Sequence, residues 1–253
     1  MASIDPYTQE LVAFILLVIP AIFYIMGMYE GRKGAWLFGA GLGLHLVSIA
    51  ERWMYTGLIP LSEKRDNISF MALCMAILYL IMRVRRDSKG AINTLAPVVV
   101  CGLLVVAPMF RTMDSISPFM QTPWFYGHVI FYFASYAMFA LSACFGVINA
   151  IQPDEAKEWS QYRLASIGWI HLTASLICGS IWFYIAYGHY WLWTSKELWI
   201  TALWLYYAVY LHARLMPALK GRTAAIIGAL GFAVALFTYF GVGTVIPSPP
   251  TQF

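Results

Sequence analysis

Charged residues are scarce in this chain of 253 residues: 11% are Asp, Glu, Lys or Arg, while 61% are hydrophobic. Soluble domains carry about 25% charged residues, so a soluble globular protein is excluded. The formal net charge of +4 does not indicate a nucleic-acid partner. Long apolar runs recur along the whole chain instead. The sequence therefore predicts a membrane protein that contacts lipid over most of its length.

Cysteine is also scarce, and the cysteines are scattered. Each of the four lies alone in an apolar segment: Cys74, Cys101, Cys144 and Cys178. The sequence contains no Cys-x-x-Cys-His motif, which excludes covalent attachment of haem to this chain by the usual motif. We interpret the cysteines as small buried hydrophobic residues. An internal repeat is also missing, which argues against a transporter built from inverted repeats.

The apolar runs divide into eight candidate transmembrane helices, since a hydrocarbon core of about 30 Å needs about 20 apolar residues per helix. They are 10–29, 35–56, 67–84, 91–110, 124–151, 163–188, 197–215 and 223–246. These segments leave no room for a soluble domain. We therefore predict an all-α fold, a polytopic membrane helix bundle that forms a single domain over residues 1–253. Leu11–Met28 is expected to be a retained helix, because the N-terminus lacks a basic region and a cleavage site.

The basic residues orient the bundle. Eleven of the Lys and Arg residues lie in the connections after the first, third, fifth and seventh segments, and five lie on the other side. Basic residues are enriched on the cytoplasmic side of membranes. Both termini are therefore predicted to be extracytoplasmic. The stretch Gln152–Tyr162, which carries charges of both signs, is expected to be a solvated loop on the inner side.

Aromatic residues are concentrated in residues 179–199, here named the aromatic segment. It contains three tyrosines and His189 together with four tryptophans, Trp182, Trp191, Trp193 and Trp199. An interfacial girdle explains some of these rings, since amphipathic rings suit the membrane–water boundary. Their density around one histidine favours a flat aromatic surface on the outer face that contacts a planar apolar ligand. Haem is the obvious candidate.

The five histidines are His45, His128, His171, His189 and His212. Polar residues in membrane helices are costly, so each is a candidate ligand of a haem iron. The alternative for each is a hydrogen bond between helices. Axial ligands of one haem must lie at nearly one depth. His128 and His189 both lie near the outer face and form a candidate outer pair. Within the membrane, depth favours His45 with His171, and His212 lies lower.

These motifs resemble, in the same order, the cytochrome c assembly family of haem-handling membrane proteins, which includes CcsA, CcmC and CcmF. CcsA is the most similar. The family's tryptophan-rich "WWD" signature runs Gly-x-x-Trp and then Trp-Gly-x-Tyr-Trp-x-Trp-Asp-Pro-Lys-Glu-x-Trp. This chain has Gly179-Ser-Ile-Trp182, followed by Tyr187-Gly-His-Tyr-Trp-Leu-Trp-Thr-Ser-Lys-Glu-Leu-Trp199. His128 with Ser135-Tyr-Ala137 is similar to the family's outer histidine helix, and Tyr206–Leu215 is similar to its next histidine helix.

The resemblance implies a function. Family members receive haem in the membrane and present it outside on the tryptophan-rich segment, where the thiols of an apocytochrome attack the haem vinyl groups. It implies that His128 is an outer haem ligand and that His212 is a membrane haem ligand. We expect one or two molecules of haem b. The resemblance also implies a partner subunit of the ResB/CcsB kind, and location in the cytoplasmic membrane of a bacterium.

The chain departs from the signature at Tyr187, Thr194 and Ser195, where the family has Trp, Asp and Pro. The family's second outer histidine, after its last helix, is missing, and His189 is its candidate replacement. These departures leave a second function open: a membrane b-type cytochrome subunit of a quinol-linked respiratory complex, with a multihaem cytochrome c as partner. The enzymatic role is accordingly either in a haem lyase or cytochrome c synthase, or in a quinol oxidoreductase. A regulatory scaffold of the HemX kind is a third alternative.

Overall fold

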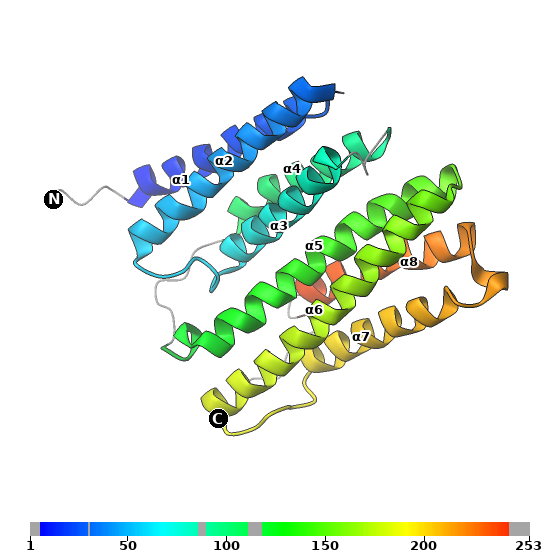
Figure 1. Cartoon of the computed structure of the whole chain (residues 1–253). Helices are drawn as coiled ribbons and strands as arrows, with labels where there is room; N and C mark the ends of the chain where they lie inside the picture. The colour runs from blue at the N-terminus through cyan, green and yellow to red at the C-terminus, as the bar shows by residue number, and fades with distance from the viewer. Residues whose placement is uncertain (1–5, 30, 86–89, 111–117, 243–253) are drawn as a thin grey trace. The chain divides into compact units, whose positions relative to one another are not determined.

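The computed structural model describes residues 6–29, 31–85, 90–110 and 118–242, with side chains from Leu11 onward. Over these residues the chain forms eight α-helices (Figure 1), which confirms the all-α prediction. The helices are α1 (Pro6–Met26), α2 (Gly31–Thr56), α3 (Lys64–Val84), α4 (Ile92–Val106), α5 (Pro123–Ile151), α6 (Glu155–Tyr187), α7 (Ser195–Ala213) and α8 (Arg222–Leu236). A single π-turn, Phe237–Gly241, continues α8.

Six helices of the described chain are long and apolar enough to cross a membrane. They are α2, α3, α5, α6, α4 with its 3-10 extension (Ile92–Met109), and α8 with its π-turn (Arg222–Gly241). A shorter apolar stretch, Leu11–Met26, belongs to α1. The prediction of a polytopic membrane bundle is therefore confirmed. The extracytoplasmic location of both termini stays a prediction.

The start of α6 differs from the sequence prediction. The expected solvated loop Gln152–Tyr162 is wrong, because α6 begins at Glu155. Asp154 provides the cap: its side chain accepts a hydrogen bond from the backbone N–H of Ala156 at 2.8 Å. The carboxylates of Glu155 and Glu158 lie in the first turn, where their negative charge is stabilised by the positive end of the helix dipole. The 33 residues of α6 span about 50 Å at 1.5 Å per residue, so its ends reach beyond the hydrocarbon core.

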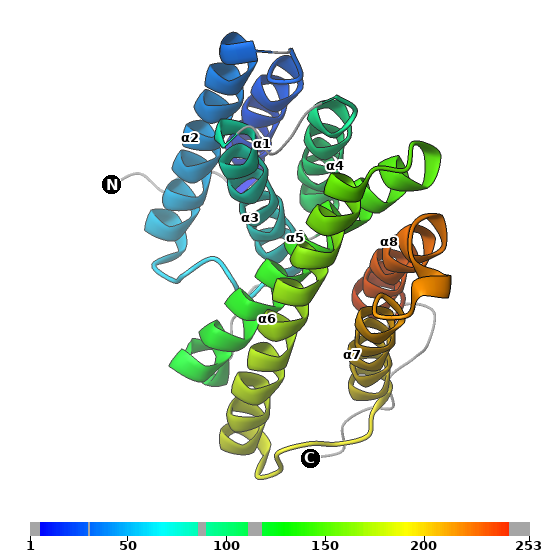
Figure 2. The ribbon, with the colours of Figure 1, turned by 45° about the vertical axis from the view of Figure 1, so that its right-hand side comes forward.

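The chain forms two compact units, residues 1–116 and residues 117–253. The first unit contains α1 to α4, and the second contains α5 to α8 with the aromatic segment. Within the second unit, α5 and α6 lie side by side along most of their length in both views (Figures 1 and 2). The single domain predicted for residues 1–253 stays a prediction.

In the first unit, the buried side chain of Arg83 in α3 binds the chain just after the end of α1. Its guanidinium donates to the carbonyl oxygens of Gly27 and Tyr29, the second at 2.5 Å. Carbonyls at a helix C-terminus have no partner within the helix and attract cations. Arg83 also donates to the Tyr79 hydroxyl at 3.1 Å, and that hydroxyl donates to Asn93 in α4 at 3.1 Å. One cation thus joins three helices.

In the second unit, the fully buried residue Gln161 in α6 joins three helices through its side chain and its backbone carbonyl. Its amide donates to the carbonyl of Ala225 in α8 at 3.0 Å, and its backbone carbonyl accepts from Ser142 in α5 at 2.9 Å. Gly146 and Gly228 leave room for this amide, because a Cβ atom at either position would overlap its nitrogen. Small residues of this kind let membrane helices approach closely.

Replacing Arg83 with Met should destabilise the protein by about 3 kcal/mol, because buried carbonyl and hydroxyl groups lose their charged donor. The measurement is unfolding of the purified protein in detergent, followed by circular dichroism against temperature. The matched control is Arg85→Met, since Arg85 lies two residues on and is exposed. Equal stability of the two variants would contradict the role assigned to Arg83.

Candidate functional site

The first element of the site is His128 in the second turn of α5. Thr122 and Pro123 determine where this helix begins. The Thr122 hydroxyl accepts a hydrogen bond from the backbone N–H of Phe125 at 3.2 Å. Proline suits the first helical position, where its missing N–H has no helical partner. This start places His128 close to the end of the helix, as the sequence predicted.

The ring of His128 is held by Ser175 of α6. Its Nδ1 lies 2.9 Å from the carbonyl oxygen of Ser175 and 3.1 Å from the Ser175 hydroxyl. The hydroxyl in turn donates to the carbonyl of His128 at 2.9 Å. A carbonyl oxygen only accepts, so Nδ1 carries the hydrogen and Nε2 carries the lone pair. Nε2 has no hydrogen-bond partner among the described residues, and it is therefore available to a metal.

Two further residues of α6 surround this ring. A Cβ atom at Gly179 would lie 2.6 Å from Nδ1 of His128, so the absent side chain makes room for the imidazole. The indole of Trp182 lies nearly parallel to the imidazole, at 12° with 6.2 Å between ring centroids. Ser175, Gly179 and Trp182 are spaced by four and three residues and share one face of α6. We name these three residues the His128 cradle.

The tryptophans of the aromatic segment divide into different packing environments. Trp182 lies in α6 beside His128. Trp199 lies in α7 against Phe237, with 4.7 Å between ring centroids. Trp191 and Trp193 lie on the connection between α6 and α7, and their ring planes meet at 76°. The flat surface predicted from the sequence is therefore wrong, because helical positions turn two of the four rings toward neighbouring helices.

The connection from α6 to α7 nevertheless brings polar and aromatic groups to the end of the unit where His128 lies. Gly188 ends α6 with a left-handed backbone (φ 76°), and the exposed His189 follows directly. The indole nitrogen of Trp191 is buried and has no acceptor among the described residues. A buried N–H without an acceptor is costly. A ligand that accepts a hydrogen bond here would remove that cost.

Thr194, which stands where the family signature has Asp, is the N-terminal capping residue of α7. Its hydroxyl donates a hydrogen bond to the carboxylate of Glu197. An aspartate at this position would place a second carboxylate against Glu197. Threonine at position 194 thus provides a hydrogen-bond donor to Glu197, and the aromatic segment carries one negative charge fewer than with aspartate.

His171 and His212 are arranged alike within their helices. Nδ1 of His171 donates to the Ile167 carbonyl at 2.8 Å, and Nδ1 of His212 donates to the Ala208 carbonyl at 2.7 Å. Nε2 of each has no hydrogen-bond partner in the described part of the chain. His212 is exposed on α7, whereas His171 packs beside Phe131 of α5 at 5.8 Å between ring centroids. Both remain candidates for metal ligation.

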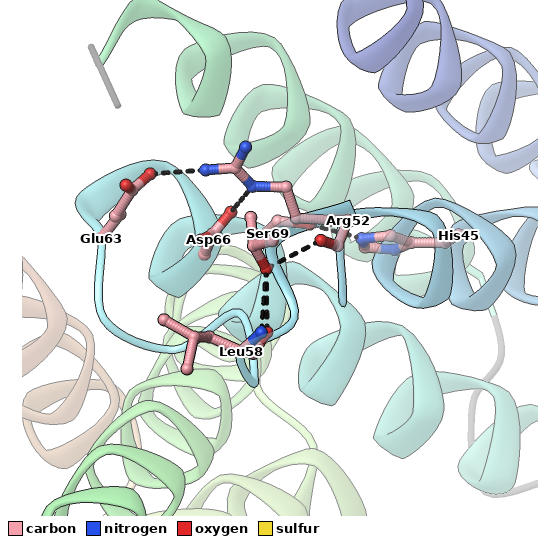
Figure 3. Close-up of polar contacts among 7 residues, drawn as sticks. His45, Arg52, Leu58, Glu63, Asp66 and Ser69 are labelled. Atoms are coloured by element: carbon pink, nitrogen blue, oxygen red, sulfur yellow. Dashed lines mark hydrogen bonds and ion pairs between the residues drawn. The ribbon is translucent and has the colours of Figure 1, made fainter. Parts of the chain in front are cut away.

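His45 differs from the other histidines. It is fully buried in the first unit, and both ring nitrogens are engaged. Nδ1 is hydrogen-bonded to the Tyr24 hydroxyl at 3.2 Å. Nε2 is hydrogen-bonded to the Ser69 hydroxyl at 2.9 Å (Figure 3). The hydrogen bond between helices, the alternative left open by the sequence, is what the structure shows. The pair of His45 with His171 stays a prediction, and ligation of an iron by His45 would break one of these bonds.

Arg52 belongs to a polar network that the sequence did not predict (Figure 3). Its guanidinium lies between two carboxylates, 2.7 Å from Oε2 of Glu63 and 3.3 Å from Oδ1 of Asp66. Glu63 is buried. Arg52 lies two turns beyond His45 on α2, so the end of α2 and the start of α3 are joined by charge as well as by the His45–Ser69 bond. We interpret this network as structural.

This chain is similar to known proteins over most of its length. The sequence profile of the family described as Cytochrome C assembly protein matches residues 61–248. "Cytochrome c biogenesis protein CcsA" of Chlamydomonas reinhardtii is 29% identical over 232 residues, covering 83% of this chain and 65% of that protein. The protein of the same name from Chlorella vulgaris is 25% identical, and the match covers 90% of that protein and 90% of this chain.

A solved structure, "Cytochrome c Heme Lyase CcmF", is similar in fold. It matches 95% of this chain with a TM-score of 0.68 and 18% sequence identity. This chain covers 47% of the CcmF chain. The chain therefore spans about half of CcmF and about two thirds of the algal relative from Chlamydomonas reinhardtii.

Replacing Gly179 with Ala should displace the imidazole of His128, because the new methyl group would lie 2.6 Å from Nδ1. We expect a loss of about 1–3 kcal/mol, as is usual for an overpacked interior. Thermal unfolding in detergent measures it. Gly102→Ala is the control, since apart from its own helix backbone and chain neighbours no atom of the described residues lies within 4 Å of its added Cβ. A Gly179 variant as stable as this control would contradict the cradle.

Proposed function

Because the chain belongs to the cytochrome c assembly protein family, we propose that it binds haem at the end of its second unit and presents it there for attachment to an apocytochrome c. The family profile covers residues 61–248, which include the His128 cradle and the aromatic segment. One observation carries the proposal: Nδ1 of His128 is engaged by Ser175, and Nε2 has no hydrogen-bond partner among the described residues. Ligating histidines are commonly held in this way by a partner on the second nitrogen.

The residues around His128 fit a haem. His128 would supply Nε2 to the iron. The buried indole N–H of Trp191, which lacks an acceptor among the described residues, would donate to a propionate carboxylate. His189 lies at the same end of the unit and would be the second axial ligand. When bound, haem supplies the vinyl groups to which apocytochrome thiols add.

A second position would receive haem within the membrane. His212 is exposed on α7 and keeps its Nδ1 hydrogen on its own helix, which leaves Nε2 directed to an outside ligand. An imidazole exposed to lipid alone is costly, so a bound haem or a neighbouring subunit would cover it. We propose one or two haem b molecules and a partner subunit with an extracytoplasmic part, of the ResB/CcsB kind.

The location in a bacterial cytoplasmic membrane stays part of this proposal. The chain is a multi-pass membrane protein by its six candidate spans among the described residues. The matched relatives come from Chlamydomonas reinhardtii and Chlorella vulgaris, and the bacterial source is the one that the sequence resemblance implies.

A quinol-linked b-type cytochrome subunit remains the second candidate. The observation that favours it is the pair of membrane histidines, His171 and His212, whose Nε2 atoms both lack partners among the described residues. Two haems held permanently at different depths would carry electrons across the membrane, with a multihaem cytochrome c or a similar protein as partner.

Removing His128 should abolish haem binding at the outer site. We expect His128→Gly to lose the outer-site part of its haem b signal in the reduced-minus-oxidised spectrum and to recover it partly when imidazole is added, because imidazole can occupy the emptied position. His189→Ala should shift the spectrum or lower the haem content. His45→Gln is the control and should keep the wild-type spectrum, since His45 is engaged inside the first unit.

Two outcomes of this experiment would contradict the assignment. A wild-type protein that copurifies with no haem and takes up none from added haemin would overturn both candidate functions. An unchanged spectrum and haem content in His189→Ala would remove His189 as the second ligand while leaving His128 in place.

Haem transfer separates the two candidate functions. In one experiment the purified, haem-loaded protein is mixed with an apocytochrome peptide that carries a Cys-x-x-Cys-His motif. In a parallel experiment it is mixed with a quinol. Haem presentation predicts loss of haem from the protein to the peptide and no quinol-dependent reduction. Two haems that stay bound, differ in potential and are reduced by the quinol would favour the respiratory subunit instead.

A further inference from the structure

We infer that Ser175 is the positioning residue of the outer site: it fixes the tautomer of His128 so that Nε2 faces the ligand. This inference rests on the proposed function, because it assigns a role to a residue beside the proposed haem ligand. Neither the family signature, which begins at Gly179 in this chain, nor the matched relatives' names point to Ser175.

The contact between the two residues is reciprocal. The N–H at Nδ1 of His128 faces two acceptors of the same residue, the carbonyl oxygen at 2.9 Å and the hydroxyl oxygen at 3.1 Å. The hydroxyl hydrogen of Ser175 is directed to the carbonyl of His128, at 2.9 Å. Because that hydrogen is used there, the hydroxyl oxygen presents a lone pair to Nδ1. Both acceptors therefore favour the same tautomer.

The cradle exposes this carbonyl. In a helix each Cα–Cβ bond tilts toward the N-terminus, so the side chain four residues later lies over the carbonyl of the preceding turn. Gly179 is four residues after Ser175 and has no side chain there. A Cβ atom at Gly179 would lie 2.6 Å from Nδ1. Glycine at this position is thus what allows an imidazole from α5 to reach the Ser175 carbonyl.

His128 differs in this respect from His171 and His212. Those two histidines donate from Nδ1 to a carbonyl of their own helix, four residues earlier. Such a bond lies within one helix and does not fix the ring against a neighbouring helix. The partner of His128 lies 47 residues away, in a different helix, and is fully buried. Trp182 also lies nearly parallel to the ring. The orientation of His128 is therefore determined by tertiary packing.

The consequence for the ligand is chemical. A hydrogen-bond acceptor on the second ring nitrogen fixes the tautomer and orientation of a ligating imidazole and raises its basicity. Ser175 provides two acceptors, of which the carbonyl survives any substitution. Loss of the hydroxyl should therefore weaken the bias toward the Nδ1–H tautomer without abolishing it, and should weaken iron binding at Nε2.

A purely structural role for Ser175 is the competing explanation, since a serine between two membrane helices also stabilises their packing. The comparison of Ser175→Thr with Ser175→Val separates the two roles. The two side chains have nearly the same shape, but only threonine keeps the hydroxyl. Ser166→Thr and Ser166→Val form the control pair, because Ser166 donates only to its own helix, to the Tyr162 carbonyl at 2.8 Å.

Two measurements are made on the full-length protein in detergent. The first, without haem, is the ¹⁵N chemical shift of the His128 ring nitrogens, assigned by its loss in His128→Ala. The second is titration with haemin. We expect Ser175→Thr to match the wild type in both. In Ser175→Val the Nδ1–H tautomer should lose population, and haemin affinity should fall roughly 10-fold, the lower end of the loss typical for partners of metal ligands, because the Ser175 carbonyl remains.

Equal tautomer populations in Ser175→Val and Ser175→Thr would overturn the inference. Equal haemin affinities of these two variants would also overturn it when the wild type binds haemin more tightly than His128→Ala. If neither variant folds, Ser175→Ala against the wild type provides the same two readouts. Failure of the proposed function looks different: haemin would then bind the wild type no better than His128→Ala, while the ¹⁵N shifts would still report whether Ser175 holds the tautomer.

Discussion

The proposed site in the second unit depends on the two ring nitrogens of His128: Nδ1 contacts the protein, and Nε2 is available to the proposed ligand. A buried polar group needs a partner, and inside a membrane water does not supply one. Ser175 satisfies Nδ1, and the absent side chain of Gly179 makes that contact sterically allowed. Nε2 is left for something that the described chain does not provide. The start of α5 at Thr122 and Pro123 and the turn at Gly188 then bring His128 and the aromatic connection to one end of the unit.

The histidines of the two units differ in how many of their ring nitrogens are hydrogen-bonded within the protein. In the first unit His45 is closed on both sides, and the cations Arg52 and Arg83 are paired with carboxylates or helix-end carbonyls. These contacts join helices. In the second unit His128, His171 and His212 each use Nδ1 within the protein and keep Nε2 open among the described residues. The ligand chemistry that we propose therefore concentrates in the second unit.

Composition and apolar length were enough to predict the helices and the membrane. They also placed His128 and His189 at the ends of the right segments. They failed at Glu155–Tyr162, because charged residues on the outward face of a helix look like a loop when Asp154 is not recognised as its cap. They could not decide the fate of His45, since its partners Tyr24 and Ser69 lie 21 and 24 residues away. The same holds for Ser175: a serine 47 residues from a histidine carries no pattern that pairs them.

The account is tested most directly by a cryo-electron microscopy structure of the full-length protein, reconstituted in a lipid nanodisc with haem. It predicts a porphyrin at the end of the second unit, with its iron on Nε2 of His128 and with Nδ1 still against Ser175. Iron bound through Nδ1 of His128, or haem held only elsewhere while His128 stays unliganded, would contradict it.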